Sequence, residues 1–236
     1  MKKFSTPEGE LTVRPQHSSL PRIVGAVLWC LCLQYFVVEQ IVRNGWTTPY
    51  SWADNYISDL GAVECANRSP DSTRYICSPL HAAMNASFIV QGLLIAGGAA
   101  LNRAAFPARL LSTVALALLA IASAGVIAVG FAPVDVHVVT HYVGAGVHFI
   151  GGNLGMILLG TAILQKPTQS RVLPRLLGTL SLLAGSIGIM ALGLLVSGQY
   201  LGWGAGGIER VVAYPLPVLL AGTGFFLLAK RPRLDD

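Results

Sequence analysis

Six long apolar runs constrain this chain more than any other feature of its sequence. Each is long enough to cross the roughly 30 Å hydrocarbon core of a bilayer as a helix, which takes about 20 residues. That core holds no water to satisfy exposed backbone groups, and the alternation typical of barrel strands is absent, so helices are the expected spanning elements. We expect them at residues 23–42, 80–101, 110–131, 136–164, 176–196 and 211–229.

Charged residues are too few to cover the surface of a soluble domain. They make up 11% of the chain, whereas soluble domains contain about 25%. The sequence therefore predicts an all-α fold, a polytopic membrane protein built as a six-helix bundle. We expect one membrane domain over residues 22–230, between an N-terminal tail of residues 1–21 and a C-terminal tail of residues 231–236.

Basic residues indicate how the bundle is oriented. Twelve of the 16 Lys and Arg residues fall before the first expected span, in the connections 102–109 and 165–175, or after the last expected span. These segments alternate along the chain, as the positive-inside rule requires of cytoplasmic loops. We predict that both termini are cytoplasmic, that 43–79 is a long outer loop, and that the net charge of +5 reflects topology rather than nucleic-acid binding. The expected location is the bacterial plasma (inner) membrane, with the lipid bilayer as partner.

Two cysteines support this orientation. Cys65 and Cys77 both fall in the long outer loop, twelve positions apart. An oxidising compartment favours a disulfide between them, although two free thiols remain the alternative.

Polar residues concentrate in the outer half of the predicted bundle. Polar side chains inside a membrane are energetically costly, so those that are present tend to have a function. Asp59 lies in the turn-like segment Asn55-Tyr-Ile-Ser-Asp-Leu-Gly61. It is either a capping residue or a carboxylate at the mouth of a pocket, and the two roles are compatible. His81 and Asn85 open the second helix and share one face at a spacing of four.

Three histidines follow one stripe of the predicted fourth helix. At 100° per residue, His137, His141 and His148 lie within about 40° of one another. Such histidines either hydrogen-bond carbonyl groups of neighbouring helices or line a pocket. A third alternative is a zinc site made of His81, Asp135, His137 and His141, because imidazole and carboxylate are suitable zinc ligands. No cofactor is required by the sequence.

The last predicted helix is preceded by a glycine-rich run, 202–207, which we expect to be a flexible outer loop. Glu209 and Arg210 follow at the outer start of the helix, and we expect them to form an interfacial ion pair. Glu39, near the outer end of the first helix, is expected to reach the membrane surface or to pair with an inward-facing histidine.

These residues carry a resemblance. Ile57-Ser-Asp-Leu-Gly61, Gly130-Phe-Ala-Pro-Val-Asp135, His141 and His148 together resemble the bacterial and archaeal membrane family called domain of unknown function 998, over roughly residues 20–230. The Ile-Ser-Asp turn and His141-Tyr-Val-Gly-Ala145 are also similar to the eukaryotic DRAM-like membrane proteins. The first resemblance implies a six-helix membrane protein without an assigned activity, and the second implies a role in membrane lipid organisation. The segment 64–77 departs from the shorter loop expected in the first family.

Three hypotheses about function follow. The leading one is a non-enzymatic membrane protein that binds or organises a lipid or small amphiphile in an outward-facing pocket. That pocket would be lined by Asp59, His81, Asn85, Asp135, His141 and His148. The alternatives are a metal-dependent intramembrane hydrolase, with a metal-bound water as nucleophile, and a small-solute transporter.

Overall fold

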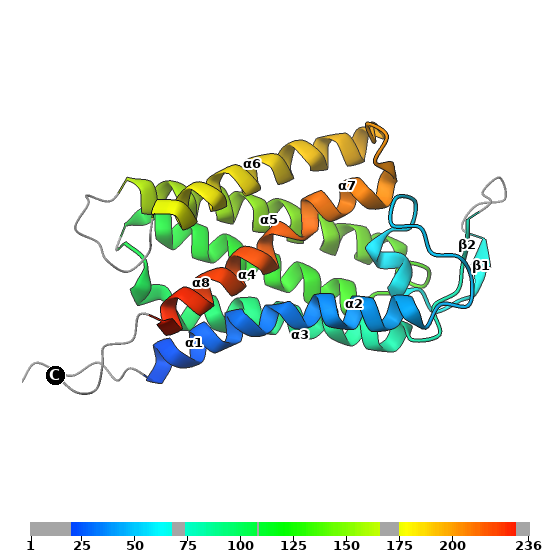
Figure 1. Cartoon of the computed structure of the whole chain (residues 1–236), viewed down its shortest axis with the longest axis horizontal. Helices are drawn as coiled ribbons and strands as arrows, with labels where there is room; N and C mark the ends of the chain where they lie inside the picture. Colours follow the sequence, from blue (N-terminus) through cyan, green and yellow to red (C-terminus); the bar gives the residue numbers. More distant parts are fainter. Residues whose placement is uncertain (1–19, 68–73, 108, 166–174, 230–236) are drawn as a thin grey trace, which may run out of the picture.

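The computed structural model describes residues 20–67, 74–107, 109–165 and 175–229. Six of its helices are long and apolar enough to cross a membrane (Figure 1). The first span is interrupted by a 3₁₀ turn, and the last is divided near Tyr214. The helices are α1 (Leu20–Cys30), η1 (Leu31–Leu33), α2 (Gln34–Asn44), η2 (Ile57–Gly61), α3 (His81–Leu101), η3 (Arg103–Ala105), α4 (Leu110–Phe131), α5 (Val138–Leu164), α6 (Arg175–Ser197), α7 (Gly204–Ala213) and α8 (Pro215–Ala229), and a short hairpin pairs β1 (Ala66–Asn67) with β2 (Tyr75–Ile76).

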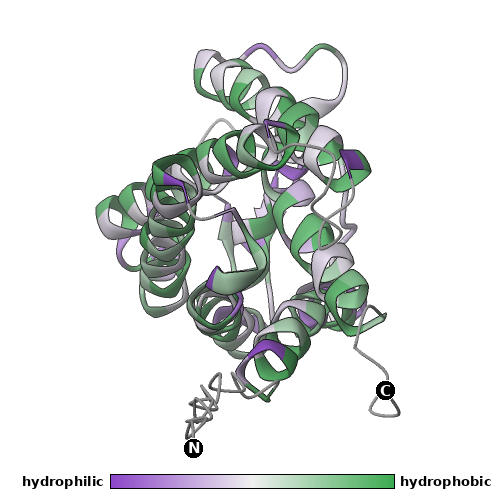
Figure 2. Ribbon diagram, turned by 90° about the vertical axis from the view of Figure 1, so that its left-hand side faces the viewer, coloured by the Kyte–Doolittle hydropathy of each residue, from purple (hydrophilic) through white to green (hydrophobic). Residues whose placement is uncertain are grey.

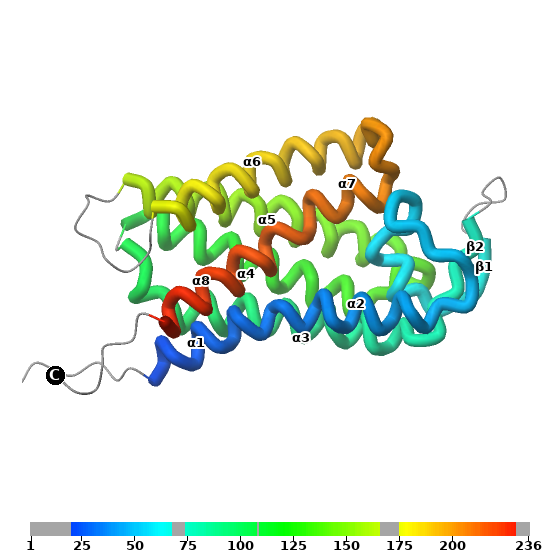
Figure 3. The backbone as a smooth tube through the Cα atoms, in the orientation of Figure 1, coloured from blue at the N-terminus to red at the C-terminus, as the bar shows by residue number. Residues whose placement is uncertain are grey.

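The spans follow one another around a ring. α3, α4, α5 and α6 pack in chain order, and α8 closes the ring against α1. The end-on view in Figure 2 shows this arrangement, and the tube in Figure 3 shows the chain passing up and down the bundle. The described chain begins and ends at the same end of the bundle, which we call the tail end. The opposite end carries η2, β1 and β2, and we call it the loop end.

Small residues allow the helices to approach closely, as is typical of membrane bundles. A Cβ atom added to Gly125 of α4 would lie 2.6 Å from the carbonyl oxygen of Gly144 in α5. In α6, a Cβ atom on Gly185 would lie 2.6 Å from the carbonyl oxygen of Asn153. Because backbone atoms cannot move aside as a flexible side chain can, these two glycines set the spacing of α5 from its neighbours.

The predicted spans agree with the structure except for the last one. The sequence placed its start at residue 211, whereas the helix begins at Gly204. The prediction of a flexible loop at 202–207 is therefore wrong for the final residues of that run. Tertiary contact explains the difference, because the backbone N–H groups of Gly206 and Gly207 donate to the carbonyl oxygen of Ala53, at 2.7 and 3.3 Å. Glu209 and Arg210 consequently lie inside a helix.

The chain is thus a multi-pass membrane protein by its six apolar helices. Which end faces the cytoplasm, and which membrane holds the protein, remain predictions from the basic residues and the resemblance.

Candidate functional site

Part of the connection after α2 folds into the mouth of the bundle at the loop end. Within it, η2 is almost completely buried, with Ile57 and Leu60 among apolar side chains of α2, α3 and α4. Asp59, the third residue of this turn, caps its start. Its Oδ2 accepts the backbone N–H of Tyr56 at 3.0 Å and the side-chain amide of Asn55 at 3.3 Å. Asp59 also pairs with Arg74, with 3.1 Å between Nη1 and Oδ2.

Side chains from two other spans hold η2 in place. Asn85 of α3 donates to the carbonyl oxygen of Gly61 at 2.9 Å. Ser78, just before α3, donates to the carbonyl oxygen of Leu60 at 2.7 Å. From the other side, Oε2 of Glu209 in α7 accepts the backbone N–H of Ile57 at 2.5 Å. A Cβ atom on Gly61 would overlap the Asn85 side chain, so a larger residue here would displace the amide that holds η2.

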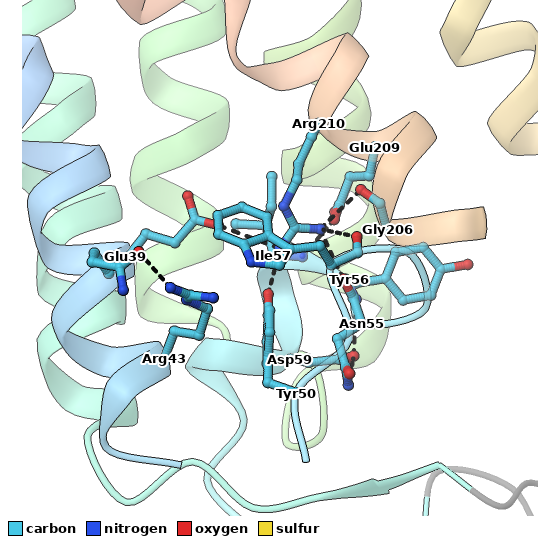
Figure 4. Close-up of polar contacts among 12 residues, drawn as sticks. Glu39, Arg43, Tyr50, Asn55, Tyr56, Ile57, Asp59, Gly206, Glu209 and Arg210 are labelled. Atoms are coloured by element: carbon cyan, nitrogen blue, oxygen red, sulfur yellow. Dashed lines mark hydrogen bonds and ion pairs between the residues drawn. The ribbon is translucent and has the colours of Figure 1, made fainter. Parts of the chain in front are cut away.

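A buried ion pair joins the first span to the last (Figure 4). Nη2 of Arg210 in α7 lies 3.3 Å from Oε1 of Glu39 in α2. Tyr214 bridges the two, since its hydroxyl accepts from Nε of Arg210 at 2.9 Å and donates to Glu39 at 2.7 Å. Glu39 is 1% exposed and Arg210 is 6% exposed. The sequence predicted Glu209 as the partner of Arg210 and a histidine as one possible partner of Glu39. Both predictions are wrong, because Arg210 and Glu39 pair with each other.

Arg210 also fixes the segment that leads into η2. Its Nη1 donates to the carbonyl oxygens of Trp52, Asn55 and Gly206 at 3.1, 2.9 and 2.9 Å, and Nη2 donates to the hydroxyl of Tyr50. The guanidinium carbon lies 4.6 Å from the centre of the Trp52 ring. Each of the three guanidinium nitrogens, which together carry five N–H donors, thus has a protein acceptor. Arg210 therefore has a structural role, and few of its N–H donors remain available to a ligand.

Tyr50 lies outside the membrane spans and shares this environment. Burial raises the pKa of its phenol above the ordinary value of about 10, while the neighbouring Arg210 charge opposes that rise. Tyr50 therefore remains a neutral hydroxyl beside the guanidinium over the physiological range.

A cavity of about 50 Å³ lies beneath η2, in the loop-end half of the bundle. Its wall draws residues from η2 and from every membrane span except α6. Most of the lining is apolar, including Phe88, Val129 and Phe149. The polar residues on the wall are Tyr35, Ser58, Gln91, His141, His148 and Glu209.

The two cavity histidines are oriented by backbone carbonyls. Nδ1 of His141 lies 2.7 Å from the carbonyl oxygen of Ala132, and Nδ1 of His148 lies 3.0 Å from that of Ala122. A carbonyl oxygen only accepts, so Nδ1 carries a hydrogen in each ring, and a neutral His148 ring keeps Nε2 as its acceptor nitrogen. The structural hydrogen bonding considered for these residues is present, and it leaves both rings on the cavity wall.

The other residues of the expected pocket lie elsewhere. Asp59 and Asn85 support η2. His81 bonds the carbonyl oxygen of Ser78 through Nδ1, at 2.9 Å. Asp135 accepts the backbone N–H of Glu64 at 2.7 Å, near the rim of the loop end. None of these four lines the cavity.

The expected zinc ligands are not brought together. α5 begins at Val138, so His137 precedes the helix, is exposed, and leaves the stripe predicted for it. Among the described residues, no group of three His, Cys, Asp or Glu side chains has the arrangement of a metal site. The set His81, Asp135, His137 and His141 is therefore not assembled in this structure.

The two outer-loop cysteines form a disulfide. Cys65 and Cys77 flank the β1–β2 hairpin, with 4.2 Å between their Cα atoms. The bond closes a twelve-residue separation at the loop end, away from the cavity.

Glu209 is the charged residue of the cavity wall that sequence reasoning did not assign to a pocket. The missed signal is a helical spacing of residues that begins directly after the glycine-rich run. Glu209, Ala213 and Pro217 follow one another at intervals of four, and all three line the cavity. Arg210 and Tyr214 repeat the same interval one residue later, and both contact Glu39.

A second, open groove of about 670 Å³ lies along another face of α7 and α8. Trp52, Trp203, Val211 and Val218 line it, and its surface is almost entirely apolar. The one charged side chain on its wall, Arg210, is already engaged by the contacts described above. The groove therefore offers hydrocarbon contact and little polar recognition, unlike the cavity.

Comparison with known proteins identifies a family and no activity. A family model described as a protein of unknown function, DUF998, matches residues 23–225. Neither a curated protein nor a solved structure matches the chain. The similarity to DRAM-like proteins is not shown by this match. Since the matched region extends from the first span into the last, the chain belongs to the DUF998 family.

Proposed function

We propose that the protein binds the polar end of a lipid or small amphiphile in the cavity beneath η2, and that it does so without catalysing a reaction. The observation that carries this proposal is the composition of the cavity wall. Polar groups of Tyr35, Ser58, His148 and Glu209 stand among aromatic and aliphatic side chains in one partly open cavity. Ligand sites characteristically combine a mostly apolar wall with a few convergent polar groups.

The polar groups on this wall have spare hydrogen-bonding capacity. Within the described part of the chain, neither the Tyr35 hydroxyl nor the Ser58 hydroxyl forms a hydrogen bond, and His148 is bonded through Nδ1 alone. Buried polar groups are normally satisfied, by water if not by protein. About 50 Å³ accommodates a few waters or one small polar headgroup.

The depth of the cavity favours binding over passage through the membrane. Toward the tail end, the centre of the bundle is filled by an apolar cluster that includes Trp29, Ile95, Leu119, Met156 and Leu216. A transport pathway requires polar groups near the middle of the membrane and beyond. The cavity instead ends within the loop-end half, which suits a ligand that enters from one leaflet.

The metal-dependent hydrolase has less support than binding. Of the four residues expected to hold zinc, His141 alone lines the cavity. A catalytic zinc site takes three protein ligands around one ion.

Native mass spectrometry of the purified protein tests the proposal. Ala145 lines the cavity on α5, and Ala145→Leu would fill part of it. Ala120→Leu on α4 is the matched control, because Ala120 is exposed on the lipid-facing surface. We expect co-purifying lipid or amphiphile on the wild type and the control, and at least a threefold loss of the bound fraction in Ala145→Leu. Equal occupancy in all three proteins, or no bound amphiphile in folded wild type, would overturn the proposal.

A further inference from the structure

The buried charges of the loop-end half do not balance within the described part of the chain. Glu39, Asp59, Glu209 and Arg210 are all at most 7% exposed. Arg210 is paired with Glu39, and Asp59 is paired with Arg74. Among the described residues, Glu209 has no ion-pair partner within 4.0 Å. A carboxylate buried without a partner is costly when ionised, so Glu209 is either protonated or compensated by a positive group.

The position of Glu209 provides room for that group. Its Oε2 accepts the backbone N–H of Ile57, which fixes the carboxylate against η2. No hydrogen bond to the other oxygen, Oε1, is formed by the described residues, and Glu209 lines the cavity. The arrangement therefore holds a carboxyl group on the wall of a partly open cavity, with one oxygen available to a donor.

The remaining wall is also suited to a hydrogen-bond donor. Nε2 of His148 is an acceptor nitrogen, because Nδ1 carries the hydrogen that bonds Ala122. The hydroxyls of Tyr35 and Ser58 can accept as well as donate. Phe88 and Phe149 also line the cavity, and the face of an aromatic ring can attract a cation. Arg210, which follows Glu209 in α7, is already engaged by Glu39 and by backbone carbonyls.

We infer that the polar end of the ligand is a small protonated amine, held by Glu209 with His148 as a second acceptor. This inference rests on the proposed function, because it names the chemical class of the headgroup that the cavity takes. A carboxylate or phosphate headgroup would face Glu209 without a free cation to offset the repulsion. A neutral alcohol would bond the wall without stabilising an ionised Glu209.

Three single-chain probes of equal length separate these classes: dodecylamine, dodecan-1-ol and dodecanoate. Apparent dissociation constants are measured by native mass spectrometry in one nonionic detergent. Ratios between protein variants are compared, since partition of a probe into micelles cancels in such a ratio. Glu209→Gln removes the charge while its amide oxygen can still accept from Ile57. Glu64→Gln is the matched control, because Glu64 is an exposed carboxylate whose loss changes the net charge equally.

We expect Glu209→Gln to weaken dodecylamine binding at least tenfold and to change dodecan-1-ol binding less than threefold. Glu64→Gln should change neither. In the wild type, dodecylamine should displace the alcohol, and dodecanoate should not. This competition needs no variant, so it decides the matter even if Glu209→Gln fails to fold.

The outcomes distinguish the two proposals. If the alcohol binds but the amine shows no preference, or if dodecanoate competes as well as the amine, the amine inference is overturned and the proposed function stands. If folded wild type binds none of the probes and carries no co-purified amphiphile, the proposed function fails, and the amine inference fails with it.

Discussion

The loop-end and tail-end halves of this bundle are built from the same helices but are held together differently. At the tail end, Trp29, Ile95 and Leu119 form part of a continuous apolar core. At the loop end, an ion pair, a capped turn and a set of side chain-to-carbonyl hydrogen bonds join α2, η2, α3 and α7. The tail end thus depends mainly on packing, whereas the loop end depends on polar groups that are costly to separate.

This difference also explains where the cavity lies. In a membrane, apolar side chains gain little from leaving lipid for protein, so close packing is what stabilises an apolar core. A gap in the tail-end core would forfeit that packing. At the loop end, directional hydrogen bonds to η2 hold the helices apart at fixed positions, and the space between them persists.

Removing Arg210 should have the largest effect on the loop end. Arg210→Ala leaves Glu39 buried without its ion-pair partner and frees the carbonyl groups of Trp52 and Asn55. Removing one partner of a buried ion pair lowers the free energy of unfolding by about 3–5 kcal/mol. The measurement is the free energy of unfolding in mixed micelles titrated with SDS, with the exposed Arg103→Ala as control.

A double variant sharpens that experiment. If the cost comes from stranding Glu39, then Glu39→Gln combined with Arg210→Ala should lose at least about 1 kcal/mol less than the sum of the two single variants. Additive losses would show that Arg210 acts on its backbone partners independently of Glu39.

Truncating Trp29 should have a smaller effect, on the tail end. Trp29 is fully buried, its Nε1 donates to the carbonyl oxygen of Ile95 at 3.3 Å, and its ring packs against Phe106. We expect Trp29→Ala to cost about 2–3 kcal/mol, at or below the lower end of the range for soluble cores, because lipid is itself apolar. Leu93→Ala, at a position 59% exposed, is the control.

The comparison predicts that this change leaves amphiphile binding intact. Native mass spectrometry of Trp29→Ala should show the same bound fraction as wild type, whereas Arg210→Ala should lower it by loosening the segment above the cavity. Loss of ligand in Trp29→Ala at a temperature where the protein is folded would mean that the two halves are coupled.

The smallest predicted effect is a dependence on alkaline pH confined to the loop end. The pKa of Tyr50 is raised in the folded protein, so the unfolded chain releases this proton first, near pH 10. Stability contributed by Tyr50 is therefore fully present below about pH 10 and declines as pH rises further, by roughly 1 kcal/mol half a unit above it. Tyr50→Phe should make that decline shallower, as measured by SDS titration at several pH values.

Tyr142→Phe is the matched control for this experiment, since Tyr142 is 64% exposed on α5. If the pH dependence of the free energy of unfolding is unchanged in Tyr50→Phe, or changes equally in Tyr142→Phe, the alkaline effect does not come from the buried Tyr50 phenol.

The sequence by itself determined the six spans and the concentration of polar residues toward one end. Both follow from local physics: a run of about 20 apolar residues needs a bilayer, and intramembrane polar residues are rare enough to stand out. The motif around Asp59 was recognisable as a cap, and His141 and His148 as inward-facing residues of one stripe.

Tertiary structure alone decided which of those residues meet. The first turn of α7 is fixed by the N–H of Gly206, which donates to the carbonyl oxygen of Ala53, over 150 positions away in the chain, and no local pattern encodes that contact. Extending the helix to Gly204 turned Glu209 toward the cavity and Arg210 toward Glu39. Ion pairs and cavities depend on distances between spans, and the sequence of one span does not specify its rotation against the next.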